Sequence, residues 1–356
     1  MRSLQIGDLT IPIPIVQGGM GIGISLSGLA AAVAFEGGIG TIASVGLGLI
    51  HGTPGKSYRQ NNIDGLVKEI RLARQLTTGV LAVNIMSVLT NFSELVQTAI
   101  KEKIDIIFSG AGLPLNLPQF KTRESKTKLV PIVSSGRAAH IITKKWLQNY
   151  NYLPDAFVVE GPKAGGHLGF SLNDLNSQAH DINTLVRDVL EVTDEIAKEH
   201  QKEVPVIAAG GILSGSQMHE LINIGASAVQ LGTSFIGTAE CDASDKFKEA
   251  FINAGESKIR LIKSPVGLPG RAIENDFLLA AERGEKRPKN CKHNCIKSCD
   301  PKTTNYCIAE ALLAAYYGNL DSGFAFSGAY GYKIKSISSV QEVFKRFIYE
   351  YNQVSH

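Results

Sequence analysis

The sequence predicts an α/β fold: a (β/α)8 TIM barrel with a smaller, mainly helical insertion after strand eight. Three observations lead to this prediction. Short apolar runs recur eight times with helix-like segments between them, small or polar residues follow each run, and the pattern changes after the eighth. Buried parallel strands alternate with helices in this way, and eight such units make a barrel. A doubly wound open sheet is the competing architecture, and the count of eight favours the barrel.

The eight apolar runs are the expected barrel strands. In chain order they span residues 13–16, 39–43, 80–83, 104–108, 129–133, 156–159, 204–208 and 228–231. Apolar residues at helical spacing between charges predict helices in the intervening stretches. The clearest of these cover residues 64–76, 93–102 and 181–200.

After the eighth run, residues 242–305 carry no clear strand, several charges and the Gly/Pro-rich piece Ser264-Pro-Val-Gly-Leu-Pro-Gly-Arg271. We expect this segment to be an insertion that lies over the mouth of the barrel. Two further helices, at about residues 306–317 and 340–351, would close the outer ring. The predicted domains are therefore a barrel made of residues 1–241 and 306–356, and an insertion made of residues 242–305.

The composition describes an ordinary globular protein. Among 356 residues, 44% are hydrophobic and 19% charged, and the net charge of +3 is too small to indicate a nucleic-acid or membrane partner. Residues 9–55 contain Glu36 as their one formal charge, but Gly37-Gly38 divides them into pieces too short to cross a bilayer. The N-terminus shows no signal-peptide pattern, so we expect a cytoplasmic protein. The sequence leaves a homodimer open.

The loop Glu160-Gly-Pro-Lys-Ala-Gly-Gly-His-Leu-Gly169 is the strongest candidate for a catalytic site. It follows the sixth apolar run directly and places His167 among glycines. Glycines such as Gly165 and Gly166 let backbone approach a flat or phosphorylated molecule, and imidazole suits proton transfer near neutral pH. The alternative is a mobile surface loop with an incidental histidine.

Two further loops have the composition of a phosphate site. Ala208-Ala-Gly-Gly211 stands before a helix that begins near Ser214, and Gln230-Leu-Gly-Thr233 follows one unit later. Backbone N–H groups at glycine turns bind phosphate, and barrels often place such a site after strands seven and eight. The expected ligands are Ala209, Gly210, Gly211, Gln230, Gly232 and Thr233.

The remaining strand ends would line the mouth with amides and bare backbone, a surface that suits a planar heterocycle. They contribute Gln17, Gly18, Gly19 and Met20 after the first run, Asn84 after the third and Glu160 after the sixth. Flavin mononucleotide (FMN) fits both halves of such a site, and Asn84 could hydrogen-bond the ring edge. For Asn84 the alternative is a turn or helix-cap residue.

The order of these motifs resembles the nitronate monooxygenase family, formerly called 2-nitropropane dioxygenases, over about residues 10–280. Flavin-dependent enoyl-acyl-carrier-protein reductases share the pattern. The resemblance rests on the following motifs, of which Ala-Gly-Gly-His is the most specific: Gln17-Gly-Gly-Met20, Asn84-Ile-Met86, Glu160-Gly with Ala164-Gly-Gly-His-Leu-Gly169, Pro205-Val-Ile-Ala-Ala-Gly-Gly211, Gln230-Leu-Gly-Thr233 and Gly270-Arg-Ala-Ile with Asn275.

The resemblance implies an FMN-bearing barrel in which His167 matches the catalytic histidine and the glycine loops match the FMN contacts. In a nitronate monooxygenase, His167 would act as a base toward a nitroalkane or orient a nitronate, and oxygen would complete conversion to a carbonyl compound and nitrite. In an enoyl reductase, NAD(P)H would reduce FMN, and His167 would assist reduction of an enoyl thioester. A non-catalytic flavin-binding redox sensor is the alternative from another class.

Two features depart from the family pattern. Lys163 stands where many relatives carry an acidic residue. We expect it to point outward as a surface lysine, and the alternative is that it favours an anionic substrate or a cofactor phosphate. Four cysteines, Cys291, Cys295, Cys299 and Cys307, fall within 17 residues, but their spacing does not match a paired C-x-x-C zinc ribbon. Reduced structural thiols are the expected state in a cytosolic chain, with a metal site and regulated disulfides as the alternatives.

Overall fold

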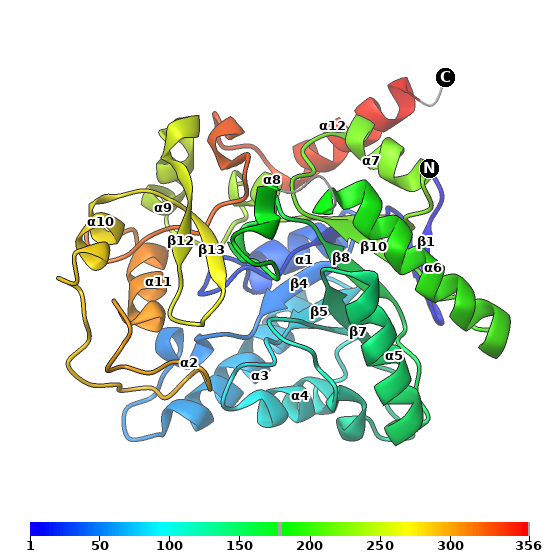
Figure 1. Ribbon diagram of the computed structural model, residues 1–356, viewed down its shortest axis with the longest axis horizontal. Helices are drawn as coiled ribbons and strands as arrows, with labels where there is room; N and C mark the ends of the chain where they lie inside the picture. The colour runs from blue at the N-terminus through cyan, green and yellow to red at the C-terminus, as the bar shows by residue number, and fades with distance from the viewer. Residues whose placement is uncertain (177–179, 355–356) are drawn as a thin grey trace.

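A computed structural model describes residues 1–176 and 180–354, and its central feature is an eight-stranded parallel sheet (Figure 1). The spatial order of the strands is β3-β11-β10-β8-β7-β6-β5-β4. Their bounds are Ile15–Gln17 (β3), Gly40–Ala43 (β4), Leu81–Asn84 (β5), Ile106–Ser109 (β6), Lys128–Val133 (β7), Phe157–Glu160 (β8), Val206–Ala209 (β10) and Ala228–Leu231 (β11). Each strand overlaps one of the eight apolar runs.

The sheet closes into a barrel. On one side β3 pairs with β11, with Val229 opposite Ile15. On the other side a parallel bridge joins Val16 to Ile39, the residue just before β4. The strands are buried almost throughout, as strands covered on both faces must be. The TIM-barrel prediction is confirmed.

Helices surround the barrel, and five of them begin at a residue whose side chain caps the helix. Ser57, Ser135, Asp181, Ser214 and Ser339 each accept a hydrogen bond from a backbone N–H in the first turn of their helix. The ring comprises α1 (Ser27–Phe35), α3 (Tyr58–Leu76), α4 (Phe92–Lys101), α5 (Gly136–Tyr150), α6 (Ile182–His200), α7 (Gly215–Asn223) and α12 (Val340–Gln353).

Short elements complete this ring. The 3-10 helix η1 (Leu117–Phe120) replaces a full helix between β6 and β7, and α12 packs against α7 and α1 to close the circle. The other short pieces are α2 (Leu47–Ile50), η2 (Asp174–Asn176), α8 (Thr233–Ile236) and η5 (Gly331–Lys333). Over the described part of the chain, we find no helix with the length and apolarity that a bilayer crossing requires.

An N-terminal hairpin that the sequence analysis did not anticipate covers one end of the barrel. Strands β1 (Leu4–Ile6) and β2 (Leu9–Ile11) pair antiparallel around Gly7, whose φ of +60° suits glycine. Leu4, Ile6 and Ile11 are buried in one cluster with inward residues of the barrel strands. The hairpin therefore fills the end of the barrel at which the strands begin.

The segment after β11 contains two strands, so the expectation that residues 242–305 carry no clear strand is wrong. Besides α9 (Asp245–Ile252), η4 (Glu256–Lys258) and α10 (Asp276–Glu282), it forms the antiparallel pair β12 (Ile259–Lys263) and β13 (Pro269–Ile273). The strand pattern was hidden because β12 is only partly buried and carries charges, while its sheet is completed by a distant segment. That segment is β9 (Gly166–His167), which pairs with β13.

Helix α11 (Ile308–Tyr316) lies at the mouth of the barrel and not in the outer ring. Its residues Ile308, Ala309 and Leu312 line the large cavity there. In Figure 1, α11 stands beside α10 and the β12–β13 hairpin, on the opposite side of the molecule from α5 and α6. Of the two helices expected to close the ring, only α12 does so.

Candidate active site

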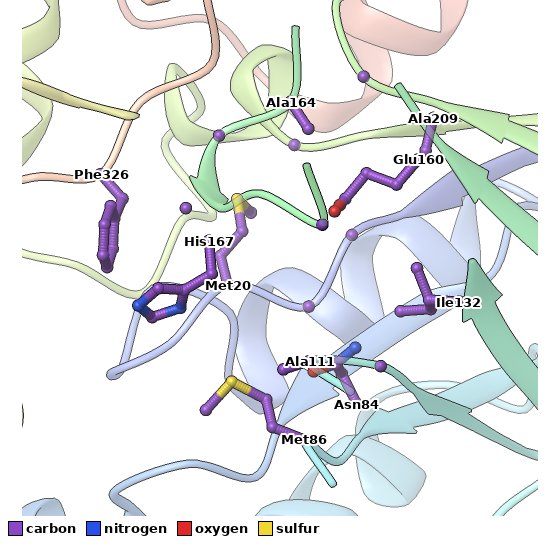
Figure 2. Close-up of a pocket in the computed structure, with 18 of the residues that line it drawn as sticks. Met20, Asn84, Met86, Ala111, Ile132, Glu160, Ala164, His167, Ala209 and Phe326 are labelled. Atoms are coloured by element: carbon purple, nitrogen blue, oxygen red, sulfur yellow. The ribbon is translucent and has the colours of Figure 1, made fainter. Parts of the chain in front are cut away.

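A cavity of about 760 Å³ opens at the carboxyl ends of the barrel strands. Its size falls within the range of small-molecule and cofactor sites. Figure 2 shows the side chains of Asn84, Glu160 and Ile132 arranged around it, with His167 and Phe326 at one side. The cavity is lined by most of the residues that the sequence indicated as catalytic or cofactor-binding. These are Gly18, Gly19, Met20, Asn84, Glu160, Gly165, Gly166, His167, Ala209, Gly210, Gly211, Gln230, Gly232 and Thr233.

Gln17 is the one predicted ligand that does not line the cavity. Its side chain is fully buried and bonds to barrel backbone: Nε2 donates to the carbonyl oxygens of Gly18 (2.8 Å) and Thr41 (3.0 Å), and Oε1 accepts from the N–H of Thr41 (2.9 Å). These bonds occupy the amide at the junction between β3 and β4. Gln17 therefore joins two strands and is not available to a ligand.

His167 is held by partners that come from distant parts of the chain. Its Nε2 lies 2.7 Å from Oγ of Ser264, which directly follows β12, and its ring meets Phe326 edge-on with centroids 4.9 Å apart. The backbone of His167 pairs with Gly270 in β13. Burial lowers the pKa of His167 to about 4, because the apolar surroundings disfavour the charged ring. The imidazole is therefore neutral at pH 7.

Arg271 anchors the loop that carries His167. Its Nη1 donates to the carbonyl oxygens of Pro162 (2.8 Å) and Ala164 (2.6 Å). The guanidinium thus connects β13 to the backbone just before the Gly-Gly-His sequence. Arg271 belongs to the Gly-Arg-Ala-Ile motif, whose role could not be inferred from the sequence alone.

Glu160 places a carboxyl group in the cavity without a hydrogen-bond partner among the described residues. It ends β8, and Figure 2 shows its carboxyl oxygens directed into the cavity. Burial raises the pKa of Glu160 from 4.5 to about 7, since no cation offsets the loss of hydration. A substantial fraction of these carboxyl groups is therefore protonated at neutral pH and can donate a hydrogen bond to a ligand.

The glycine loops leave backbone amides open to a ligand. Gly210 and Gly211 have φ angles of +99° and +82°, a conformation that favours glycine. The N–H groups of Gly211, Gly232 and Thr233 donate to no other described residue. Free amides on adjacent loops are the usual means of holding a phosphate.

The floor of the cavity depends on close packing at Gly19. A Cβ atom at that position would lie 2.3 Å from Cβ of Asn84, closer than two such carbons can approach. Gly19 therefore allows the Asn84 amide, which no described side chain engages, to face the cavity (Figure 2). A cavity with free backbone amides at its glycine loops and an amide side chain on its floor fits a phosphorylated planar ligand.

The side chains that contact His167 could not be recognised in the sequence. Ser264 and Phe326 contact His167 from positions far along the chain, and residues 325–327 run beside β13, where the N–H of Ser327 donates to the carbonyl oxygen of Arg271. The Gly/Pro-rich piece after residue 263 was the available signal for Ser264. Lys163 is exposed and also lines the cavity at its rim, where its Nζ lies 5.4 Å from the ring centroid of Tyr330.

The cysteine cluster forms part of the cavity wall through one member, Cys295. All five cysteines are free thiols, and no three His, Cys, Asp or Glu side chains among the described residues are arranged to hold a metal ion. The backbone around Cys295 is fixed to the loop after β5, since the N–H of Thr90 donates to the carbonyl oxygen of Cys295 over 3.1 Å. The cluster therefore borders the cavity and ties residues 294–297 to the barrel.

A parallel barrel with a histidine and a carboxyl group facing one cavity at its strand ends has the construction of a barrel enzyme. The comparisons with known proteins give the family. The nitronate monooxygenase family model matches residues 2–95 and 81–350, so the chain belongs to that family and is an oxidoreductase.

The similar proteins agree with this assignment. A probable nitronate monooxygenase of Staphylococcus aureus (strain MSSA476) is 28% identical over 305 residues, which cover 76% of this chain and 78% of the relative. Among solved structures, FabK from Thermotoga maritima is 27% identical with a TM-score of 0.73, covering 97% of this chain and 94% of FabK. A nitroalkane oxidase from Streptomyces ansochromogenes, 22% identical, shares the fold with a TM-score of 0.74 over 97% of each chain.

Proposed function

We propose that the protein is an FMN-dependent nitronate monooxygenase that converts alkyl nitronates and O2 to carbonyl compounds and nitrite. The observation that carries this proposal is the neutral His167 at the wall of a glycine-lined cavity that also offers free backbone amides. Family membership supports the reaction class, and the 28% identity with a probable nitronate monooxygenase supports the substrate.

The residues that would hold FMN are those that line the two halves of the cavity. Gly211, Gly232 and Thr233 would bind the phosphate through backbone N–H groups. Asn84 and the protonated Glu160 would donate hydrogen bonds to polar atoms of the rest of the molecule. When bound, the flavin would supply the electron-accepting chemistry that oxidation of a nitronate requires.

The chain's own residues would position the substrate and limit access of water. His167 stands beside Phe326 at the wall and can meet a polar group of the substrate, while residues Gly267 to Pro269 and helix α11 flank the mouth. Because the imidazole is neutral at pH 7, it does not form an ion pair with an anionic substrate. Its contribution is a directed hydrogen bond.

An absorption spectrum and a nitrite assay test the proposal together. Purified protein reconstituted with FMN should show flavin bands and release nitrite from a nitronate in air. His167→Ala should lose most of this activity, whereas His140→Ala, at an exposed position on α5, should retain it. A protein that fails to bind FMN under any reconstitution condition would contradict the proposal.

An NAD(P)H-dependent enoyl thioester reductase is the second candidate. The motifs are shared with flavin-dependent enoyl reductases, and the similarity to FabK extends over 97% of this chain. Anaerobic mixing separates the two candidates. Bleaching of the flavin by NADH and reoxidation by an enoyl thioester, without nitrite release in air, would favour the reductase. A cytoplasmic location and a homodimer stay predictions under either function.

A further inference from the structure

We propose that Ser264 fixes His167 as a hydrogen-bond donor toward the cavity, so that His167 binds an oxygen atom of an anionic substrate and does not act as a base. The choice of nitronate as that substrate rests on the proposed function. The assignment of the histidine tautomer does not, because it follows from contacts within the chain.

The first step concerns the hydroxyl group of Ser264, a buried residue with 4% of its surface exposed. A serine hydroxyl has one proton to donate and can accept two hydrogen bonds. Oγ of Ser264 already accepts the N–H of Val266 over 3.3 Å. Its remaining described partner is Nε2 of His167 at 2.7 Å.

The hydroxyl proton therefore has one described acceptor, which is Nε2 of His167. If Nε2 instead carried a proton, Oγ would receive two N–H groups and its own proton would be left without an acceptor in a buried place, an arrangement that native structures avoid. Donation from Ser264 to Nε2 satisfies every group in this contact. Because a neutral imidazole carries one proton, that proton then resides on Nδ1.

The second step concerns the direction of Nδ1. This atom has no hydrogen bond to the described residues, and His167 lines the cavity. In Figure 2 one ring nitrogen of His167 points away from the cavity and the other lies on the side of Met86 and Asn84. Since Nε2 is engaged by Ser264, Nδ1–H is the group offered to a ligand.

The chemical consequence is a preference for substrates that have already lost their acidic proton. A nitrogen that carries a proton cannot remove one from a neutral nitroalkane, but it can donate a hydrogen bond to the negatively charged oxygen of a nitronate, and such bonds are stronger than neutral ones. Ser264 acts as a positioning residue, since it reaches the substrate only through His167.

The tautomer can be measured without turnover by ¹⁵N NMR of flavin-free protein labelled at its eight histidines. The signal of His167 is identified by its loss in His167→Gln. At pH 7 we expect the shift pattern of a neutral ring protonated at Nδ1. Wild-type protein with the proton on Nε2, or with a charged ring, would overturn the assignment.

Two serine variants show whether Ser264 is responsible. Ser264→Ala removes the donor, so the His167 signal should move toward the Nε2–H tautomer. Ser298→Ala is the matched control, because Oγ of Ser298 donates to the carbonyl oxygen of Val266 in the same loop over 2.8 Å without contacting His167. An unchanged tautomer in Ser264→Ala would overturn the role of the serine.

Kinetics with the FMN-loaded protein tests the substrate preference. We expect kcat/KM for a nitronate to exceed that for the neutral nitroalkane at least about a hundredfold, and Ser264→Ala to lower the nitronate value about tenfold, the worth of one charge-assisted hydrogen bond. Equal turnover of both forms would overturn the donor role. The expected tautomer without nitrite from either substrate would contradict the proposed function and leave the assignment intact.

Discussion

Nη1 of Arg271 donates to the carbonyl oxygen of Ala164 over 2.6 Å, and this bond joins β13 to the backbone three residues before His167. The same nitrogen also reaches the carbonyl oxygen of Pro162. The position of the loop that carries His167 therefore depends on a side chain that lies more than a hundred residues further along the chain. Both bonds involve a charged donor, which makes them stronger than bonds between neutral groups.

Arg271→Met should destabilise the protein and lower its activity. Methionine keeps a long apolar side chain but leaves the carbonyl oxygens of Pro162 and Ala164 without their hydrogen-bond donor. We therefore expect a loss of about 2–4 kcal/mol in the free energy of unfolding. Urea denaturation measures this loss. Arg283→Met is the control. Arg283 is exposed and pairs with Glu285, so the variant should change stability by less than about 0.5 kcal/mol. Equal stability of both variants would contradict the anchoring role.

Gly19→Ala should impair flavin binding. The added Cβ would meet Cβ of Asn84 at 2.3 Å and force the floor of the cavity to move. Overpacking of this kind costs about 1–3 kcal/mol, so we expect FMN affinity, measured by fluorescence quenching, to fall about tenfold or more. Gly255→Ala is the control, because Gly255 has a φ of −82° and an added Cβ would lie 3.9 Å from Oγ of Ser257, an ordinary contact distance. Unaltered FMN affinity in Gly19→Ala would show that the floor can adapt.

Glu160→Gln should change how stability depends on pH. The pKa of Glu160 rises from 4.5 in its ordinary state to about 7 in the folded protein, so the folded state binds this proton more tightly than the unfolded state. Its contribution to stability is therefore complete below about pH 4.5 and disappears as the pH rises through 7.

The matching measurement is the difference in unfolding free energy between Glu160→Gln and wild type at several pH values. Between pH 5 and 7 the wild type should lose stability relative to Glu160→Gln. Other titrating groups contribute equally to both proteins, so they do not affect this difference. His167 has the opposite sign, because its pKa is lowered to about 4, and it contributes equally to both proteins. A difference that stays constant with pH would contradict the raised pKa of Glu160.

Asp242→Ala should weaken the start of helix α1. The carboxylate accepts the N–H groups of Leu26 (2.7 Å), Leu29 (3.1 Å) and Gly28 (3.2 Å), so it caps a helix that lies far from it in sequence. Loss of such a cap costs about 1–2 kcal/mol. Thermal unfolding should show the decrease, whereas Asp64→Ala, which removes an exposed ion pair with Lys56, should change little.

The strand ends could be predicted from the sequence because each strand and its following loop are local patterns. Apolar runs followed by glycine placed Gly19, Gly211 and Gly232 at one cavity, since parallel strands of a barrel all end at the same face. The N-terminal hairpin escaped recognition because each of its strands is only three residues long, too short to show a period.

The contacts that orient His167 could not be predicted because their partners are remote. Ser264 lies 97 residues away in sequence, and Phe326 lies still further. Nor could the sequence show that Gln17 turns from the cavity toward the backbone of Thr41, since both orientations are compatible with a glutamine at a strand end. Tertiary contacts determine how these side chains are oriented, and such contacts cannot be inferred from composition or motif spacing.

The placement of Phe326 and Gly328 in the cavity wall has a consequence for biosynthesis. During translation the barrel strands leave the ribosome well before residues 326–330, which face His167 and Lys163 in the finished protein. A nascent chain that has completed all eight strands thus still lacks one side of its binding site. A product truncated before residue 326 would lack that side of the cavity even though all eight barrel strands were present.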